Sequence, residues 1–224
     1  MNRHTPLLLL LAACCSSTAV VAQAAARTPE SIAAIRQRAE QGNAAAQYNL
    51  GVRYDNGEGV AENDAEAVKW YRLAATQGDA LAQLNLGYMY DKGEGVAEND
   101  AEAVKWYRLA ADQGDADAQF NLGSMYADGE SVPKNAAEAV TWYRLAADQG
   151  YAKAQSNLGL MYANGKGVAK NNTEAYFWWS LATAQGHEQA ETNRTIIEKE
   201  MTQEQIAEAQ RRSAAWKPKD AGAN

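Results

Sequence analysis

Cysteine is nearly absent from this chain of 224 residues, and both copies, Cys14 and Cys15, lie close to the N-terminus. The surrounding segment carries Arg3, continues through the apolar residues 7–13 and ends in small residues before a cleavage site after Ala24, as an export signal does. We therefore predict a signal peptide over residues 1–24. Its removal would leave a chain without a thiol, which excludes disulfides, thiol catalysis and thiolate metal sites.

A second processing route is open in the same segment. Leu11-Ala12-Ala13-Cys14 resembles the lipobox of bacterial lipoproteins, in which the cysteine is lipidated and becomes the new N-terminus. Only thirteen residues precede the cysteine, which is short for such a signal, and the apolar sequence continues through Val21. We therefore favour export to the periplasm or the medium over a lipid anchor at Cys14.

Long apolar runs and an excess of basic residues are also missing. No segment after the export signal reaches the roughly 20 apolar residues that span a bilayer. With Arg3 removed, 20 of the 21 basic residues remain against 28 acidic ones, a net charge of −8. The lysines stand one helical turn from glutamates, as Lys69 does from Glu66, and so do not form the basic stripe that nucleic acid requires. We expect no membrane span and no nucleic-acid partner.

Histidine is as scarce as cysteine, since the chain holds only His4 and His187. His4 leaves with the export signal, and we expect His187 at the surface near a helix junction. The prominent glutamates stand at cap or ion-pair positions, so no pair of carboxylates is set apart for acid–base chemistry. We predict no catalytic residue, no metal ligand, no cofactor and no enzymatic activity.

What the chain has in abundance is repetition. A block of 36 residues occurs four times, and Gln47, Gly51 and Trp70 each return at that interval. Self-similarity of this period is typical of a solenoid, in which every unit buries its apolar face only against its neighbours. We predict an all-α solenoid over residues 42–186, with units at 42–77, 78–113, 114–149 and 150–186.

Each unit is predicted to hold two helices. In the first unit, Asn43 is the N-cap of the first helix and Gly57 ends it, at the start of a Gly-x-Gly-Val loop. Asn63 and Glu66 fit a capping box for the second helix, which ends at Gly78. The short connections between helices favour antiparallel neighbours, so the units are expected to stack side by side.

Glycine and tryptophan recur inside the predicted helices. Glycine in a helix costs about 1 kcal/mol relative to alanine, so its presence at Gly51 indicates that another helix backbone comes close. We expect Trp70, together with Tyr54, to fill the space between the paired helices. In the loop, Ser131 replaces the second glycine of the third unit, which indicates that glycine is preferred there but not required.

The pattern A-x-A-Q-x-N-L-G-x-x-Y-x-x-G-x-G-V, followed by E-A-x-x-W-Y-R-x-A-A-x-Q-G, resembles the SEL-one-like repeat family, a relative of the tetratricopeptide repeats, over residues 42–186. The resemblance implies helical hairpins that build a right-handed superhelix and serve as adaptors in complex assembly, envelope signalling or host contact. Some secreted members carry a disulfide in every unit. Functions tied to those members are not implied for this chain.

The ends of the array are expected to cap it. Thr28 followed by Pro29 predicts the start of an N-terminal capping helix within residues 25–41. Two further helices are predicted within residues 187–216, and residues 217–224 are expected to form a loose tail. Terminal units of a solenoid must present a different outer face, which explains why the fourth unit drifts from the pattern.

Comparison of the four units separates scaffold positions from surface positions. On each first helix, the shared residues lie on one arc and the variable residues on the opposite arc. In related solenoids this helix lines the concave side. We predict a binding face for a protein or peptide partner on the variable arc, at Tyr48, Val52, Leu84, Tyr88, Phe120, Ser124, Ser156 and Leu160, with a ladder of amides at its margin, Asn49, Asn85, Asn121 and Asn157.

Two structural alternatives stay open at this face. Contiguous exposed apolar side chains favour partner binding, but curvature of the array would bring adjacent first helices together and make the same residues inter-unit core. The asparagines would either clasp the main chain of an extended peptide or hydrogen-bond a neighbouring loop.

The sequence therefore predicts an exported bacterial repeat scaffold, periplasmic or secreted, that recognises a protein or peptide and acts in assembly or regulation. The alternative is an outer-membrane-anchored structural lipoprotein, lipidated at Cys14, that assembles envelope machinery. A secreted hydrolase is disfavoured because no catalytic constellation can be assembled from the residues present.

Overall fold

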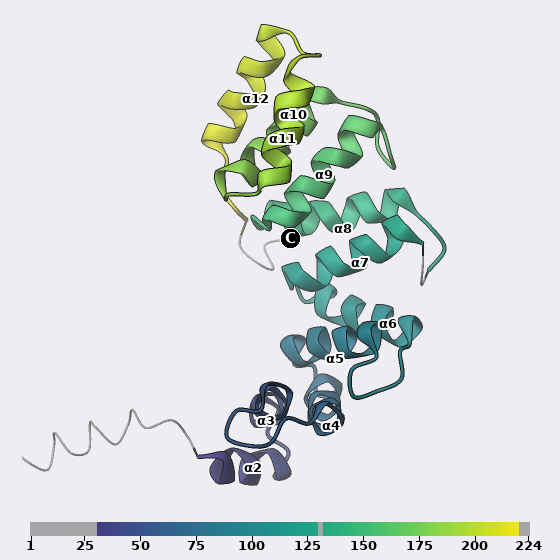
Figure 1. The fold of residues 1–224 in the computed structure, drawn as a ribbon, viewed down its shortest axis with the longest axis vertical. Helices are drawn as coiled ribbons and strands as arrows, with labels where there is room; N and C mark the ends of the chain where they lie inside the picture. The colour runs from purple at the N-terminus through teal and green to yellow at the C-terminus, as the bar shows by residue number, and fades with distance from the viewer. Residues whose placement is uncertain (1–30, 130–131, 220–224) are drawn as a thin grey trace, which may run out of the picture.

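A computed structural model describes residues 31–129 and 132–219, most of which are helical (Figure 1). The predicted export signal 1–24, with Cys14 and the cleavage site after Ala24, lies outside these residues. The eleven described helices are α2 (Ile32–Glu40), α3 (Ala44–Asn56), α4 (Asp64–Thr76), α5 (Ala80–Lys92), α6 (Asp100–Asp112), α7 (Ala116–Asp128), α8 (Ala136–Asp148), α9 (Ala152–Asn164), α10 (Asn172–Ala184), α11 (Glu188–Glu198) and α12 (Gln203–Ala215).

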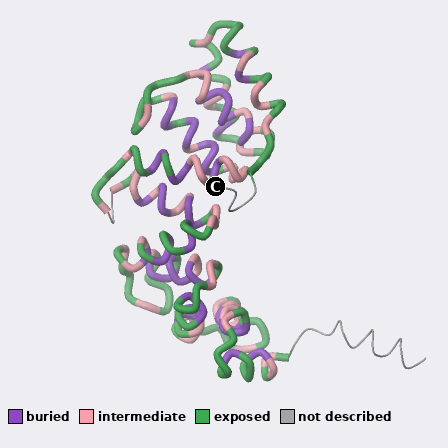
Figure 2. Tube along the Cα trace, turned by 180° about the vertical axis from the view of Figure 1, so that it is seen from behind, coloured by how far each residue is buried: buried purple, intermediate pink, exposed green. Residues whose placement is uncertain are grey.

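The helices form an elongated stack in which each packs mainly on its neighbours in sequence (Figure 1). The first helices of the units, α3, α5, α7 and α9, pair with the second helices α4, α6, α8 and α10, and each second helix packs on the next first helix. Buried residues follow the inner sides of the helices from one end of the stack to the other (Figure 2). The predicted all-α solenoid of four helix pairs is confirmed.

The first helices begin and end where the sequence predicts. The side chains of Asn43, Asp79 and Asp115 each accept a hydrogen bond from the amide three residues on, at 2.8, 2.9 and 2.8 Å. Tyr151 takes this position in the fourth unit, without a side-chain cap. Each first helix ends at a glycine in the left-handed region, as at Gly57 with φ of 68°, where a residue without a β-carbon is unstrained.

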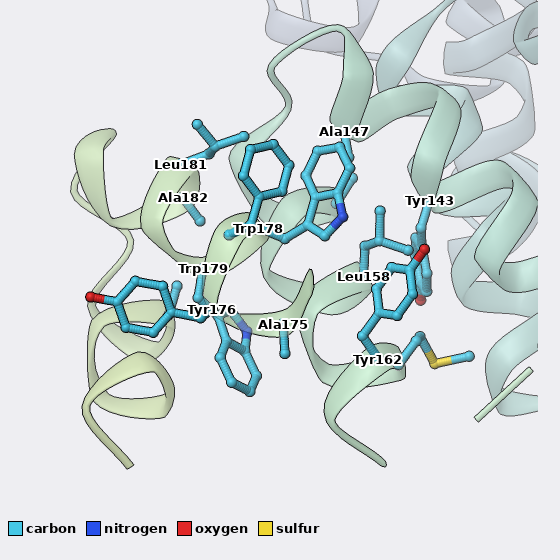
Figure 3. Close-up of a cluster of buried hydrophobic side chains, with 14 of the residues drawn as sticks. Tyr143, Ala147, Leu158, Tyr162, Ala175, Tyr176, Trp178, Trp179, Leu181 and Ala182 are labelled. Atoms are coloured by element: carbon cyan, nitrogen blue, oxygen red, sulfur yellow. The ribbon is translucent and has the colours of Figure 1, made fainter. Parts of the chain in front are cut away.

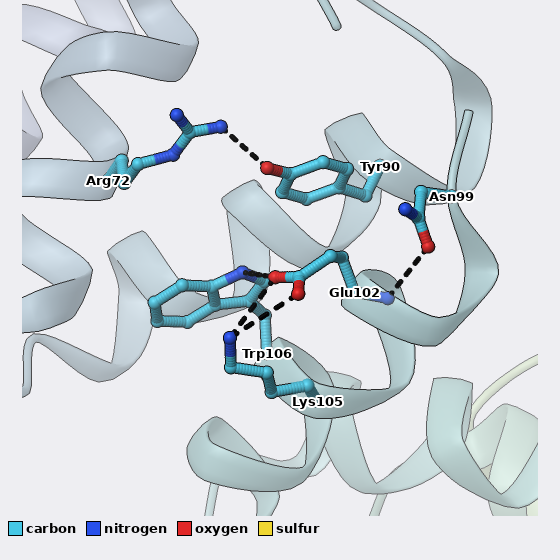
Figure 4. A network of polar contacts seen from close by, with 6 residues as sticks. All are labelled: Arg72, Tyr90, Asn99, Glu102, Lys105 and Trp106. Atoms are coloured by element: carbon cyan, nitrogen blue, oxygen red, sulfur yellow. Dashed lines mark hydrogen bonds and ion pairs between the residues drawn. The ribbon is translucent and has the colours of Figure 1, made fainter. Parts of the chain in front are cut away.

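The second helices begin at the predicted asparagines, but their capping boxes are only half formed. The Asn63 Oδ1 accepts a hydrogen bond from the Glu66 amide at 3.0 Å, while the Glu66 carboxylate binds Lys69 instead of the cap. In the second unit, the carboxylate of Glu102 accepts a hydrogen bond from the indole of Trp106 at 3.1 Å (Figure 4). The predicted reciprocal box is wrong here because side chains one turn ahead compete for the carboxylate.

The glycine inside each first helix makes room for a ring and not for a helix backbone. A β-carbon on Gly51 would lie 2.6 Å from the ring of Tyr71, and one on Gly87 would lie 2.7 Å from the ring of Tyr107. Tyr71 is fully buried. The expectation of a close backbone is therefore wrong. Trp70 is half-buried and packs against the core of α2 and α3. Its equivalents Trp106, Trp142 and Trp178 are buried, as expected of core residues.

The second glycine of the loop lies against the backbone of the preceding unit. A β-carbon on Gly95 would lie 2.3 Å from the carbonyl carbon of Asp64, and one on Gly167 would lie 2.1 Å from the carbonyl oxygen of Ala136. Backbone atoms cannot turn aside as a side chain does. The expectation that glycine is merely preferred is therefore wrong for these two loops, and Ser131 lies outside the described residues.

A buried glutamine ties each first helix to the second helices on both sides of it. Gln83 Nε2 donates to the carbonyl oxygen of Ala75 at 3.0 Å, and its Oε1 accepts a hydrogen bond from Gln113 at 2.7 Å. Because unpaired buried amides are unfavourable, these bonds fix the register between units. The same two contacts recur at Gln47, Gln119 and Gln155.

Helix α2 occupies the place that a second helix of a further unit would take. Arg36 donates to the hydroxyl of Tyr54 at 2.7 Å, as Arg72 does to Tyr90 one unit on (Figure 4). The carbonyl of Ala39 accepts the hydrogen bond of Gln47, as Ala75 does for Gln83. The N-terminal cap is thus a half unit that satisfies the first glutamine of the ladder.

The start of α2 differs from the prediction. Ser31 is extended and accepts a hydrogen bond from the Ala34 amide, so it is the N-cap of the helix. The predicted N-cap, Thr28, and the following Pro29 lie outside the described residues.

Helices α11 and α12 both pack on α10 and close the C-terminal end. Tyr176, Trp178 and Trp179 of α10 belong to a core cluster that reaches back to α8 (Figure 3). The chain then returns to the third unit, where Lys219 forms an ion pair with Asp148 at 2.9 Å. The expectation of a loose tail is therefore wrong for its described part, 217–219.

Candidate functional site

The candidate site follows one side of the first helices, and we name it the first-helix face. Its predicted residues form two columns along the stack. The inner column consists of Tyr48, Leu84, Phe120 and Ser156, and the outer column consists of Val52, Tyr88, Ser124 and Leu160.

The inner column packs on the rings of the second helices. The ring centroids of Tyr48 and Tyr71 lie 6.0 Å apart, and those of Phe120 and Tyr143 lie 5.8 Å apart. Ser156 is buried, and its carbonyl oxygen accepts a hydrogen bond from an indole of α10 at 3.0 Å. The inner column is thus the floor of the face, and its side chains are partly core.

The outer column reaches solvent. Tyr88 and Leu160 are 45% and 46% exposed, while Val52 and Ser124 are half-buried. Helix α11 packs on α10 as α5 packs on α4, so it acts as a fifth first helix and brings Ile196, which is 56% exposed, into the same column. Ile196 was not among the predicted residues, although it follows Leu160 at the repeat interval of 36 residues.

The asparagines at the margin of the face contact the buried tyrosines. Burial raises the pKa of the Tyr71 hydroxyl, the carboxylate of Asp55 raises it further, and a hydrogen bond from Asn85 acts in the opposite direction. Three of the four predicted amides thus have a partner inside the protein, and Asn49 is exposed. The other two pairs are Asn121 with Tyr107 and Asn157 with Tyr143.

A cavity of about 340 Å³ opens in the face between α5, α6 and α7. Tyr107 and Phe120 contribute aromatic rings to its wall. Ser124 stands where the neighbouring units carry Tyr88 and Leu160, and its small side chain leaves this space open. Four carboxylates and one lysine supply the charges of the lining, Asp91, Glu98, Asp100, Asp128 and Lys92.

A second cavity, of about 240 Å³, opens between α9, α10 and α11. It is the equivalent of the first cavity two units on, because Trp179 takes the place of Tyr107 and Ile196 that of Ser124. Its wall is mainly apolar and includes Leu160. One charge of each sign remains, on Lys170 and Glu200.

Catalytic or metal chemistry has no visible support in the described ranges. His187 is the N-cap of α11, and its Nδ1 accepts a hydrogen bond from the Ala190 amide at 3.3 Å. Over residues 31–129 and 132–219, no cluster of three or more side chains could hold a metal ion. Within the same ranges, every helix is too short or too polar to cross a bilayer.

Comparison with known proteins places these units in one family. The model of the Sel1 repeat matches residues 44–79, 80–115, 116–151 and 152–187. The crystal structure of a Sel1 repeat protein from Oxalobacter formigenes is similar to this chain, with a sequence identity of 37% and a TM-score of 0.69. The match covers 80% of this chain and 76% of that protein. No curated protein gives a significant match.

A second solved structure is similar in fold, and this chain spans about half of its length. It is c5321, described as a protective antigen present in uropathogenic Escherichia coli strains and displaying an SLR fold. The identity is 33% and the TM-score 0.53, over 80% of this chain but only 46% of that one. Repeats of this kind generally mediate contacts between proteins. With four consecutive matches and the helix pairs that they predict, the chain belongs to the Sel1 repeat family.

Proposed function

We propose that this protein is a scaffold without catalytic activity that binds an extended segment of a partner protein on its first-helix face. The observation that carries the proposal is the outer column, where Tyr88, Leu160 and Ile196 expose large apolar side chains at equivalent positions of three first-type helices, α5, α9 and α11. Exposed apolar residues that line up in this way mark interaction surfaces more often than scattered ones do. The two cavities beside them provide pockets for side chains of the partner.

The scaffold beneath the face supports this role because it is held in place. The buried glutamines join neighbouring units, and the tyrosines under the inner column are buried and hydrogen-bonded, as Tyr71 is to Asp55 at 3.0 Å. A surface that is ordered before binding loses little conformational entropy when the partner arrives. An extended segment that crosses the helices would meet side chains at equivalent positions in every unit.

We further propose that the protein is exported to the periplasm or the medium after cleavage of residues 1–24. The pattern of a basic start, an apolar stretch and a small-residue site supports this proposal. Mass spectrometry of the mature chain tests it. An N-terminus at Ala25 supports soluble export, a lipidated Cys14 supports the envelope lipoprotein instead, and an intact Met1 contradicts both.

Site-specific photocrosslinking tests the binding face. The photoreactive residue p-benzoylphenylalanine replaces Tyr88 or Leu160 in cells that normally make the protein. Leu73 and Leu109 provide matched controls, since they are 47% and 41% exposed but lie on second helices. We expect a discrete protein adduct from positions 88 and 160 and none from positions 73 and 109. Adducts that form only from the second helices would contradict the proposal.

A further inference from the structure

We propose that the partner segment carries a basic side chain and an apolar side chain two units apart. The basic side chain enters the cavity between α5 and α7, and the apolar side chain enters the equivalent cavity between α9 and α11. This inference rests on the proposed function, because it assumes that an extended segment follows the first-helix face.

The first cavity has the shape and the wall that a basic side chain needs. Ser124 leaves open the space that Tyr88 and Leu160 fill in neighbouring units, so a side chain can pass between the outer column and the wall. Phe120, which is half-buried, contributes its aromatic side chain to that wall, whereas Tyr107 is almost fully buried. Aromatic rings attract guanidinium and ammonium groups, and guanidinium also stacks on them.

The charge of the first cavity selects a basic side chain over an acidic or neutral one. Its lining carries four carboxylates and one lysine. That lysine, Lys92, is already paired with Asp91 at 2.8 Å, so Glu98, Asp100 and Asp128 give the lining its excess of negative charge. Coulomb attraction in a partly enclosed site is stronger than in open water, because the effective dielectric constant is lower.

The second cavity offers the opposite chemistry in the same geometry. Ile196 replaces Ser124, Trp179 replaces Tyr107, and Leu160 lies beside them. The indole nitrogen of Trp179 already donates a hydrogen bond to the carbonyl oxygen of Ser156 at 3.0 Å, so it does not require a polar group of the ligand. Lys170 and Glu200 balance each other in sign. This cavity therefore favours an aliphatic or aromatic side chain through burial of apolar surface.

The two cavities together give the bound segment a direction. The acidic cavity lies nearer the α2 end of the stack and the apolar cavity at the α11 end (Figure 1). A segment with its basic and apolar residues in the reverse order would have to run the other way along the face. Two anchors in a fixed order discriminate between sequences better than either anchor alone.

The inference is tested by selection from a library of short random peptides displayed on phage, with the purified protein as bait. We expect enriched peptides to share a lysine or arginine and a large apolar residue at a constant separation. Enrichment of acidic peptides, or of peptides without a basic residue, would overturn the inference.

The enriched peptide is then measured by fluorescence anisotropy against paired variants. Glu98→Gln combined with Asp128→Asn removes two of the carboxylates that give the lining its excess of negative charge. This pair is expected to weaken binding roughly tenfold at low ionic strength, with a smaller effect at high salt because exposed charges are screened. Asp112→Asn, at the end of the second helix α6, is the matched control and is expected to leave binding unchanged. Replacement of the basic residue of the peptide by glutamine should abolish the difference between these proteins.

Leu160→Ser combined with Ile196→Ser tests the apolar anchor. We expect weaker binding that does not depend on salt, whereas Leu109→Ser is expected to have no effect. Circular dichroism verifies that every variant keeps its helix content.

The outcomes separate this inference from the proposed function. A peptide whose binding is lost with Tyr88→Ser but kept in both paired variants would overturn the inference and leave the binding face standing. Failure to enrich any peptide, or binding that only second-helix substitutions disturb, would count against both.

Discussion

The glutamine ladder makes a direct prediction about what holds the units together. Gln83 is 4% exposed, and its amide is bonded at both ends, to the carbonyl oxygen of Ala75 and to the amide of Gln113. Gln83→Met keeps the length of the side chain and removes both hydrogen bonds. The substitution therefore isolates the polar contribution of one rung from its packing.

The expected loss follows from the two bonds. Each intramolecular hydrogen bond contributes about 0.5–1.5 kcal/mol net, so the pair contributes about 1–3 kcal/mol. The carbonyl of Ala75 still accepts a hydrogen bond from the Gly78 amide at 3.0 Å, and Gln113 is exposed and can turn to water. Neither partner is left buried and unpaired, which places the loss of unfolding free energy in this range and not above it.

Urea unfolding followed by far-ultraviolet circular dichroism measures the loss, fitted with a nearest-neighbour model for repeat arrays. Gln203→Met at the exposed start of α12 is the control, and its unfolding free energy should stay within about 0.5 kcal/mol of the parent protein. A double-mutant cycle with Gln113→Ala should give a coupling of about 0.5–1.5 kcal/mol. If Gln83→Met were as stable as the control, the ladder would not fix the units and the reasoning would be refuted.

Three further predictions concern the rings and loops. Gly87→Ala should lower the free energy of unfolding by about 1–3 kcal/mol despite the better helix propensity of alanine, because its β-carbon would meet the ring of Tyr107; a stabilised variant in urea unfolding would contradict this. Gly95→Ala should also destabilise, since its β-carbon would meet the carbonyl of Asp64 and its positive φ would be strained, and a melting temperature equal to that of the parent would refute it. Burial holds the pKa of Tyr71 and Tyr107 above the ordinary value of 10.0 in the folded state, so the folded chain keeps protons that the unfolded chain loses. Stability should therefore be constant up to about pH 10 and fall above it; urea midpoints that do not fall between about pH 9 and about pH 11 would contradict the assignment.

Most of the helix framework could be predicted because local signals and the period agree. The cap at Asn43, the left-handed glycine at Gly57 and the interval of 36 residues each point to the same helix ends. The capping box at Asn63 failed for a reason that local pattern does not reveal. Whether the carboxylate of Glu66 turns back to the cap or forward to Lys69 depends on which side chains compete for it.

The packing between helices was harder to predict. Glycine at position 51 shows that something lies close, but the period does not say whether this is a backbone or a ring. Both Trp70 and Tyr71 recur in the second helix, and only the phase of the helix against its partner decides that Tyr71 fills the space. That phase is a property of two elements together.

The location of the candidate face could be predicted from the sequence, but the burial of its individual side chains could not. Tyr48 and Leu160 were expected to be equivalent members, yet Tyr48 lies partly in the core and Leu160 is open to solvent. The acidic cavity beside Asp91 and Asp128 was missed because its residues come from the middle of one unit and the first helix of the next. The role of α11 as a fifth first helix was also missed, because few residues of α11 repeat the pattern of the four units.

Methyl resonances of the protein give the most direct test of the central claim that the first-helix face receives the partner. The protein is labelled with ¹³C at methionine and leucine methyl groups and titrated with the enriched peptide. Met125 lines the acidic cavity and Leu160 the apolar one, whereas Leu73 and Leu109 are exposed on second helices. The account predicts that Met125 and Leu160 shift while Leu73 and Leu109 do not. Shifts at Leu73 and Leu109 with Met125 and Leu160 unchanged would contradict it.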